Sequence, residues 1–373
     1  MSGFVQSIIT VVLFIFILGT LVIIHELGHF VTARLAKVRV LEFGIGFPPR
    51  AKVMRSGGET LYTLNWLPIG GFVKLEGEDG NDADDPRSFA AQRYLTKMLI
   101  LVAGVAMNIL LAFVIFSGIA WLASPFVGVR FFEVQPGSPA ATAGLQAGEA
   151  IIAVDGDHYQ FITGPNALTG LKDRAGQTVV LTIADAAGAR RDVPVTLRPA
   201  SEINAKQGAL GISGANKPFE GYFYGEYTQN DLPTAIQVGV HETVRWMGLI
   251  VGGLGSLVGS VANDPTAPPP VAGPVGIATQ IGDIFWNSGP IMLLYVAGIL
   301  SANLAVVNIL PFPPLDGGRM LMITLKRLFG ARISLRAEQL TYVVGFVFLF
   351  AFIIWVSGFD LVRTLGGAPP PQP

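Results

Sequence analysis

The first 24 residues contain no Lys, Arg, Asp or Glu, and this apolar stretch runs directly into His25-Glu26-Leu-Gly-His29. About 20 apolar residues in a helix span the hydrocarbon core of a bilayer, so residues 4–24 predict a membrane-spanning helix. On a helix, His25 and His29 lie one turn apart on the same face and can bind one Zn²⁺, with Glu26 beside them as general base. Polar groups at membrane depth are costly unless they are paired or functional. The pattern therefore predicts a hydrolytic zinc site inside a membrane.

The composition also indicates a membrane protein, because 51% of the residues are hydrophobic and only 14% are charged. Four uncharged stretches are long enough to span a bilayer, at residues 4–24, 98–124, 284–315 and 339–359. Four spans place both chain termini on the same side. A net charge of −1 gives no sign of nucleic-acid binding. The absence of cysteine excludes disulfides and thiol catalysis, so zinc ligands must be His or carboxylate.

The distribution of Lys and Arg predicts the orientation of these spans. Ten of the 25 basic residues lie between positions 34 and 97, and five more lie between the third and fourth spans, whereas residues 125–288 hold nine. We therefore expect the first and third loops in the cytoplasm, and both termini and the central segment outside. The active site then lies towards the cytoplasmic side. The first span lacks a basic n-region and a small-residue cleavage site, which favours an uncleaved span over a signal peptide.

The segment between the second and third spans contains a soluble module and a linker. Residues 126–200 show period-two strands and Gly/Pro turns. Residues 134–156 read as a strand, a short Ala-rich helix and another strand, an order that resembles a bacterial PDZ domain; a generic small α/β spacer is the alternative. A PDZ-like domain would bind an extended peptide or a chain terminus by strand addition. We interpret residues 201–283 as an extracytoplasmic linker whose apolar run, 235–261, forms a helix on the membrane surface. If that helix spans instead, the orientation above changes.

The first cytoplasmic loop carries an unusually apolar segment at residues 60–74. We interpret it as two strands around a turn that contains Gly70 and Gly71. Such a hairpin is too apolar for water, and irregular backbone is tolerated at membrane depth only where protein or a cavity shelters it. We therefore expect a re-entrant β-hairpin beside the active site, able to pair with an extended substrate strand through Gly70 and Gly71; an ordinary cytoplasmic hairpin is the alternative.

A catalytic zinc site generally takes three protein ligands, so the His pair needs a partner. His158 lies in the PDZ-like module, and His241 has Arg245 four residues further on, where a second ligand would stand. Asp316 is the better candidate, because it follows the third span in a segment where prolines end the helix and glycines allow a close approach to the metal.

The motifs together resemble the site-2 protease family of intramembrane zinc metalloproteases, in its bacterial regulator-of-sigma-E protease branch. In chain order they are the His25–His29 motif, residues 68–74, the PDZ-like module, residues 273–277 and residues 308–317. The resemblance implies a zinc site of His25, His29 and Asp316 with Glu26 as the base. It further implies that the substrate strand is held by Asn303, Asn308, Pro311 and Pro313, and that Gly104 and Asn108 match a family Gly-x-x-x-Asn position. Val105 departs from the family, which often has Pro there.

The resulting expectation is a polytopic α-helical protein of the bacterial plasma membrane, with four transmembrane helices, a re-entrant β-hairpin and one extracytoplasmic PDZ-like domain. Its membrane core comprises residues 1–125 and 284–363, followed by a disordered tail at 364–373. The resemblance implies hydrolysis of peptide bonds in or near the transmembrane segments of single-span proteins, such as anti-sigma factors or remnant signal peptides. A catalytically inactive scaffold that presents the PDZ-like domain is one rival. A zinc transporter is another, although spans two and four offer almost no polar path.

Overall fold

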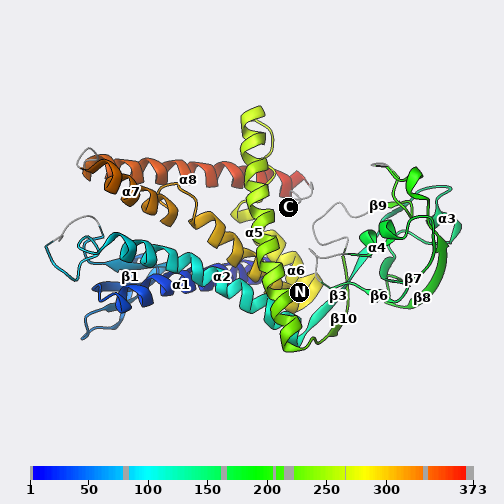
Figure 1. The fold of residues 1–373 in the computed structure, drawn as a ribbon, viewed down its shortest axis with the longest axis horizontal. Helices are drawn as coiled ribbons and strands as arrows, with labels where there is room; N and C mark the ends of the chain where they lie inside the picture. The colour runs from blue at the N-terminus through cyan, green and yellow to red at the C-terminus, as the bar shows by residue number, and fades with distance from the viewer. Residues whose placement is uncertain are drawn as a thin grey trace. The chain divides into compact units, whose positions relative to one another are not determined.

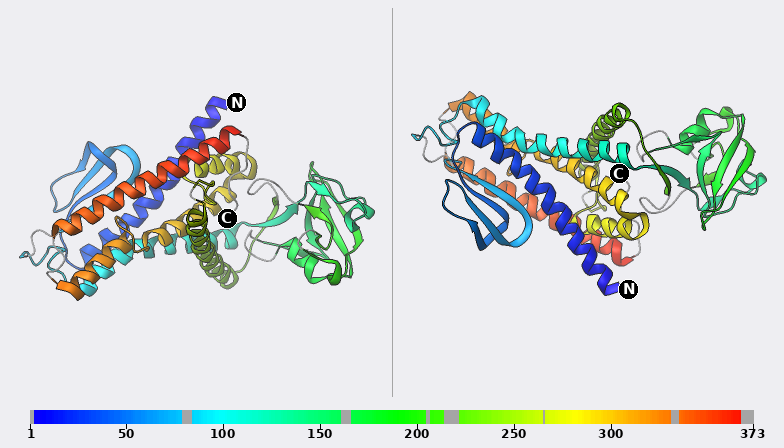
Figure 2. Two further views of the ribbon diagram at one scale, coloured as in Figure 1. Left: turned by 90° about the horizontal axis from the view of Figure 1, so that it is seen from above. Right: turned by 90° about the horizontal axis from the view of Figure 1, so that it is seen from below.

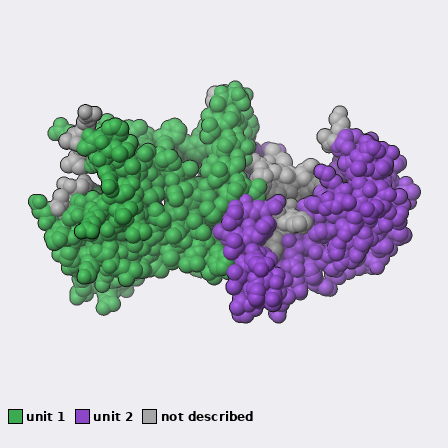
Figure 3. All heavy atoms as spheres, in the orientation of Figure 1, with its two compact units in different colours: residues 1–115, 246–361 green, residues 116–245, 362–373 purple. Residues whose placement is uncertain are grey.

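The computed structural model describes residues 3–78, 84–160, 166–204, 207–213, 222–264, 266–330 and 335–366. The chain divides into two compact units (Figures 1 and 3). The first comprises residues 1–115 and 246–361, and the second comprises residues 116–245 and 362–373.

Five helices within the described residues are long and apolar enough to cross a membrane. They are α1 (Gly3–Leu35), α2 (Tyr94–Leu122), α5 (Leu232–Asn263), α6 (Pro274–Asn308) and α8 (Leu335–Gly366). Many of their large apolar side chains are exposed, with an exposed fraction of 68% for Phe16 on α1 and 61% for Phe348 on α8. Such extensive exposed apolar surface is expected of helices that contact lipid.

This count is one more than the four predicted spans, and the additional helix is α5. The charges of Glu242 and Arg245 led to the prediction of a shorter surface helix at 235–261. In the structure α5 continues through both residues and has 32 residues, as α8 does. Charged side chains do not interrupt backbone hydrogen bonding, and the Glu242 side chain is buried. At the other end of the chain, α8 extends three residues into the predicted tail, and residues 367–373 lie outside the described residues.

Contacts within the first unit define the relative directions of α1 and α6. A Cβ atom added at Gly282, in the first part of α6, would lie 2.7 Å from Thr10, in the first part of α1. At the other end, His25 of α1 contacts Asp316, which follows α6. The chain therefore runs in the same overall direction along α1 and α6, although the non-helical residue Gly289 divides α6 into two segments.

The neighbouring helices α2 and α8 run in the opposite direction. Ile100 of α2 contacts His29, while Asn108, two turns later, contacts His25. Asp360, near the end of α8, accepts hydrogen bonds from the first turn of α6. Consequently α2 and α8 both run back towards the side from which α1 and α6 begin.

The first loop forms an antiparallel hairpin of β1 (Val40–Arg55) and β2 (Leu61–Leu75). The prediction of two strands within 60–74 is therefore wrong: this segment is one strand, and its partner comes from residues 40–55. Positive φ angles at Gly46 and Gly70 accompany the irregular register and let both strands continue past their bends. The hairpin lies along α1 (Figure 2), where Pro68 O would be 3.7 Å from a Cβ at Gly19.

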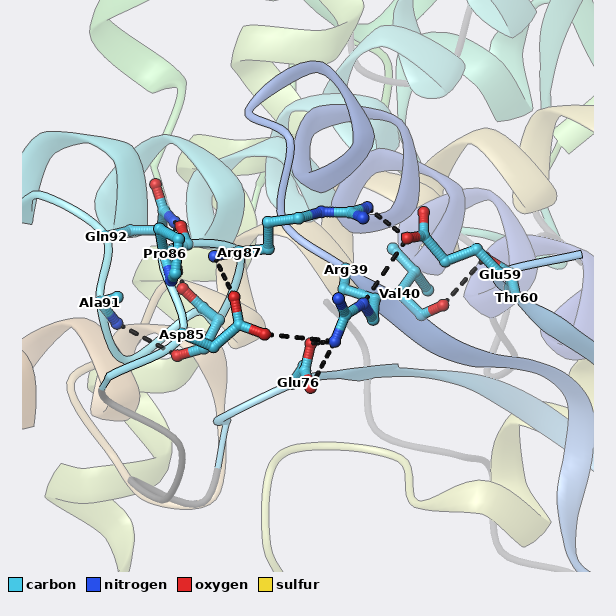
Figure 4. A network of polar contacts seen from close by, with 11 residues as sticks. Arg39, Val40, Glu59, Thr60, Glu76, Asp85, Pro86, Arg87, Ala91 and Gln92 are labelled. Carbon is cyan, nitrogen blue, oxygen red and sulfur yellow. Dashed lines mark hydrogen bonds and ion pairs between the residues drawn. The ribbon is translucent and has the colours of Figure 1, made fainter.

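A network of ion pairs closes the base of this hairpin (Figure 4). Arg39 lies 2.6 Å from Glu76, 3.2 Å from Asp85 and 3.5 Å from Glu59, and Arg87 also pairs with Glu59. The hydrogen bond from Arg87 is the main reason that the pKa of the Glu59 carboxyl is lowered. Because Arg39 follows α1 directly, the network joins the end of that helix to both strands and to the turn before α2.

The second unit contains a sheet with the strand order β10-β3-β5-β7-β8. Its strands are β3 (Ser124–Arg130), β5 (Ala150–Val154), β7 (Thr178–Ala184), β8 (Arg190–Thr196) and β10 (Tyr222–Thr228), with β6 (Asp157–His158) paired to β5. A separate pair is formed by β4 (Glu133–Val134) and β9 (Ile212–Ser213). The short helices are α3 (Pro139–Thr142), α4 (Ala167–Asp173) and the 3₁₀ turn η1 (Ala200–Glu202).

The core of this sheet is built from alternating apolar residues of its central strands. Leu181 and Ile183 of β7 pack with Ile151 of β5, and all three are fully buried. Ser138 caps α3 by accepting from the Ala141 N–H. Strand β10 lies within the predicted linker; its aromatic residues favour the extended conformation.

Candidate metal centre

The two histidines of the His-Glu-Leu-Gly-His motif lie together on one face of α1. The centroids of their rings are 4.7 Å apart, and the Nε2 atoms of His25 and His29 are 3.1 Å apart. Both side chains are buried. The helical spacing of four residues produces this arrangement, since residues i and i+4 are neighbours on a helix surface.

Asp316 meets the histidines from the first residue of α7 (Asp316–Phe329). Its Oδ2 atom is 2.9 Å from Nε2 of His25 and 3.3 Å from Nε2 of His29. The two following glycines permit this position, because a Cβ at Gly317 would lie 2.1 Å from Ile309 O and cause a backbone clash. The short helix α7 itself was not predicted from the sequence.

The three donor atoms fit a zinc ion. His29 Nδ1 is 2.7 Å from the carbonyl oxygen of Ile100, which can only accept, so Nδ1 carries a proton and leaves the Nε2 lone pair free. Tetrahedral zinc with ligands at about 2.0–2.1 Å requires donor atoms roughly 3.3 Å apart. The three separations, 2.9, 3.1 and 3.3 Å, lie close to this value. Two imidazole nitrogens and one carboxylate oxygen are also a typical donor set for catalytic zinc.

Helix α2 contributes no donor atom but holds both rings. Gly104 faces them so closely that an added Cβ would lie 2.4 Å from His29 Nε2 and 2.7 Å from His25 Cε1. One turn away on either side, the Ile100 carbonyl contacts His29 and the Asn108 amide contacts His25. The Gly-x-x-x-Asn spacing thus places a small residue and a polar residue against the histidine pair.

The side chain of Asn108 is fully buried, and its orientation bears on the protonation of His25. Its Nδ2 atom lies 3.3 Å from His25 Nδ1, and its Oδ1 atom has no hydrogen-bond partner among the described residues. When His25 binds a metal through Nε2, its Nδ1 carries a proton and needs an acceptor. A 180° rotation of the amide places Oδ1 opposite His25 Nδ1. The Nδ1 proton then has an acceptor, and Oδ1 has a donor.

A cavity of about 390 Å³ opens beside these residues. Glu26, the predicted base, lines it together with His25, His29 and Asp316. Its other walls come from the end of α6, the start of α2 and the β1–β2 hairpin, which contributes Phe47 and residues 71–73 and 75. A substrate segment entering this cavity would lie between the hairpin and the metal donors.

The residues predicted to hold a substrate strand divide into two groups. Asn308 and Gly71 line the cavity. Four others are not among its lining residues, namely Asn303, Pro311, Pro313 and Gly70. Pro311 is exposed, whereas Asn303 and Pro313 are partly buried. Gly70 has a positive φ angle and packs towards Phe47.

An ion pair in the cavity wall was not predicted from the sequence. Arg319 of α7 and Glu78, after β2, lie 2.5 Å apart and both line the cavity. Arg319 is three residues beyond Asp316, so its helical spacing was a usable signal. The sequence contained no such signal for Glu78, because its position depends on how the loop after β2 folds back.

A zinc-binding donor set with an adjacent Glu, in a chain rich in apolar helices, defines a membrane metallohydrolase. The sequence matches peptidase family M50 over residues 13–352, and the chain belongs to this family. It is 32% identical to a putative zinc metalloprotease of Clostridium perfringens, over 92% of this chain and 96% of the relative. It is 28% identical to the zinc metalloprotease RasP of Geobacillus kaustophilus, over 96% of this chain and 99% of the relative.

These matches confirm the family predicted from the motifs. The chain is a zinc-dependent metalloendopeptidase. Its long apolar helices and its similarity to RasP make it a multi-pass membrane protein.

Proposed function

We propose that this chain hydrolyses peptide bonds in or near the transmembrane segments of single-span membrane proteins. The observation that carries the proposal is that the His25, His29 and Asp316 donor atoms and Glu26 border one cavity among apolar helices. The resemblance to site-2 proteases favours anti-sigma factors and remnant signal peptides as substrates.

In the proposed mechanism, His25, His29 and Asp316 bind the zinc ion, and Glu26 is the general base. A zinc ion held by these residues would lower the pKa of a water molecule and polarise the scissile carbonyl. Glu26 would accept a proton from the attacking water and return it to the leaving amine. Burial of the His pair against α2 keeps both rings in the orientation that binding needs.

A helical substrate must unwind before its carbonyls become accessible, and we assign this step to the hairpin. Strand β2 lies along α1 at the level of the motif, since a Cβ at Gly71 would be 3.7 Å from Ile23 and 3.8 Å from Glu26. Apolar side chains on the hairpin are exposed, with Trp66 at 70%. Both features support a re-entrant position in the membrane, where a strand edge and Asn308 pair with the extended substrate.

The helix directions support four spans rather than five. α1 and the two segments of α6 run in the same overall direction, and α2 runs back to the side where both begin. The chain therefore leaves α2 and enters α6 on the same side, and a single crossing by α5 between them is incompatible with this. We accordingly propose that α5 lies at the outer membrane surface, with both termini and the 126–200 module outside and the zinc site near the cytoplasm.

Cysteine labelling tests this topology, because the chain has no native cysteine. Single cysteines at Asp231 and Asp264 flank α5. A membrane-impermeant maleimide applied to intact cells should label both from outside. If one of these cysteines is labelled from outside and the other only after lysis, α5 crosses the membrane and the four-span proposal is wrong.

We propose that the 126–200 module is PDZ-like and regulates substrate access. Its capped helix α3 between short strands supports this assignment. A module of this size would exclude substrates with a folded external domain and admit trimmed ones. Removing residues 127–199 should relax that selectivity while cleavage of short-tailed substrates continues; an unchanged preference would contradict size exclusion.

The catalytic assignment is tested with purified protein and a tagged single-span substrate. Glu26→Gln should retain zinc but lower cleavage by at least about 100-fold, since it removes only the base. Ala substitution of either histidine, or Asp316→Asn, should lower the zinc content itself, measured by mass spectrometry of the metal.

Glu59→Gln is the matched control, because Glu59 is partly exposed and lies outside the residues that line the cavity. It should keep both zinc and activity. Substantial turnover by Glu26→Gln, or full zinc occupancy in a histidine variant, would refute the assigned roles. An inactive wild type with zinc bound would instead favour the scaffold.

A further inference from the structure

A second cavity, of about 500 Å³, lies between the start of α2, the helix α7 and the start of α8. It shares Glu78, Leu101 and Arg319 with the wall of the catalytic cavity but contains none of the metal-binding residues. Its charged lining residues are Glu78, Lys97, Arg319, Lys326, Arg327 and Glu338.

The cavity carries an excess of positive charge. Arg319 pairs with Glu78, and Lys326 pairs with Glu338. The remaining two basic residues form no direct ion pair with a carboxylate among the residues that the structure describes, although Glu338 interacts electrostatically with Lys97. They are Lys97, which donates to the Ala90 carbonyl oxygen at 2.7 Å, and Arg327, whose guanidinium lies 4.5 Å from the centre of the Tyr94 ring.

Apolar side chains line the cavity beside the basic residues, and Lys97 Nζ lies 5.8 Å from the centre of the Phe89 ring. These side chains are Phe89, Leu101 and Ile323, and Leu101 lies one helical turn beyond Lys97 along α2. A ligand that satisfies both the basic and the apolar lining residues has an anionic head and an apolar body.

The position of the cavity indicates where such a ligand comes from. Tyr94 and Lys97 are in the first turn of α2, and Glu338 and Tyr342 are near the start of α8, so two apolar helices begin here. Neighbouring apolar side chains are exposed: Leu99 at 64%, Leu328 at 70% and Leu340 at 62%. This surface borders the membrane, where phospholipids are the abundant amphiphiles.

We propose that this cavity is a binding site for an anionic phospholipid, with Lys97 and Arg327 holding the phosphate and the apolar lining residues contacting the first part of an acyl chain. Basic pockets between membrane helices commonly recognise anionic headgroups. The site lies next to the Arg319–Glu78 pair, so a bound lipid contacts the wall of the catalytic cavity without touching the zinc donors. The proposal goes beyond the peptidase activity and does not depend on it.

The test measures lipid binding to the delipidated full-length protein by native mass spectrometry. Phosphatidylglycerol is compared with phosphatidylcholine of the same acyl chains, and inorganic phosphate is added as a competitor. The double variant Lys97→Gln/Arg327→Gln should bind phosphatidylglycerol about 30-fold more weakly than wild type, the combined effect of two basic groups. Its binding of phosphatidylcholine should be unchanged.

The double variant Lys52→Gln/Arg55→Gln is the matched control, since both residues are exposed basic groups of β1 outside the cavity. It should retain the preference for phosphatidylglycerol. Zinc content and thermal unfolding of each variant check its fold. Equal binding of the two lipids by wild type, or an unchanged preference in the Lys97/Arg327 variant, would overturn the proposal. Displacement of the lipid by an equal concentration of inorganic phosphate would show an anion site instead of a lipid site.

Discussion

Replacing Gly104 with Ala should disable the metal centre without altering any metal ligand. An added Cβ would lie 2.4 Å from His29 Nε2 and 2.7 Å from His25 Cε1, whereas ordinary contacts begin at 3.4 Å. The rings or the helices must therefore move by about 1 Å. Helices α1 and α2 are also in direct backbone contact nearby, since a Cβ added at Gly28 of α1 would lie 2.4 Å from the Ala103 carbonyl oxygen of α2. Moving these helices apart would break that close packing.

The size of the effect follows from the tolerance of zinc coordination. Ligand distances in functional sites lie within about 0.2 Å of their ideal values, so a shift of about 1 Å breaks the coordination sphere. We expect the zinc affinity of Gly104→Ala to fall by at least about 100-fold. A loss of about 100-fold in metal affinity is the upper end of the range seen when residues that only support the ligands are changed. The measurement is competition for zinc against a chelator of known affinity, followed by the cleavage assay.

Gly118→Ala is the matched control on the same helix. No atom lies within 4 Å of its added Cβ, and Ala favours a helix over Gly by about 1 kcal/mol. This variant should keep zinc and activity and be at least as stable as wild type. If Gly104→Ala also keeps full zinc occupancy and cleavage, the close packing of α2 against the His pair is not what holds the site, and the reasoning fails.

Three further predictions concern the zinc site and the helices that form the membrane core. Asn108→Leu should weaken zinc binding by about 10- to 100-fold, because it removes the acceptor for His25 Nδ1, whereas Asn108→Asp should retain most of the affinity; chelator competition measures both. Asp360→Ala should lower the free energy of unfolding by about 2 kcal/mol in detergent and leave zinc content unchanged, since its carboxylate accepts from the N–H groups of Gly273 and Gly276. Removal of zinc by a chelator should abolish cleavage but not helicity, and added zinc should restore cleavage; circular dichroism checks the helicity.

The sequence was most informative where a local pattern carries the geometry. Spacing along one helix was enough to bring His25 and His29 together, because helical periodicity does not depend on the rest of the fold. Asp316, 287 residues beyond His29, needed the family resemblance as well. No local rule states which helix meets which, so the cavity wall contributed by Glu78 and Arg319 was not foreseen.

The hairpin shows why strand pairing is harder to predict. Residues 42–49 contain two glycines and the pair Pro48-Pro49, which normally argue against a strand. In the structure they belong to β1, and Gly46 supplies the positive φ angle that the bend requires. The turn assigned to Gly70 and Gly71 is a bend within β2. Pairing joins residues from 7 positions apart (Arg55 and Tyr62) to 35 positions apart (Val40 and Leu75), separations that periodicity alone does not reveal.

The role of α2 could also be read only from the structure. Ile100, Gly104 and Asn108 follow one another at intervals of four residues, so they share one face of the helix, as His25 and His29 do on α1. The Ile100 carbonyl accepts from His29 Nδ1 and so fixes the position of that proton. The absence of a side chain at Gly104 makes room for both histidine rings, and the Asn108 amide contacts His25. The metal centre is thus built from two facing helical patterns, one that supplies nitrogen donors and one that sets their orientation. Only the first carries a metal-binding signature. The Gly-x-x-x-Asn spacing of α2 is recognisable through the family resemblance, but a carbonyl, a hydrogen atom and an amide do not state in the sequence what this helix does at the site.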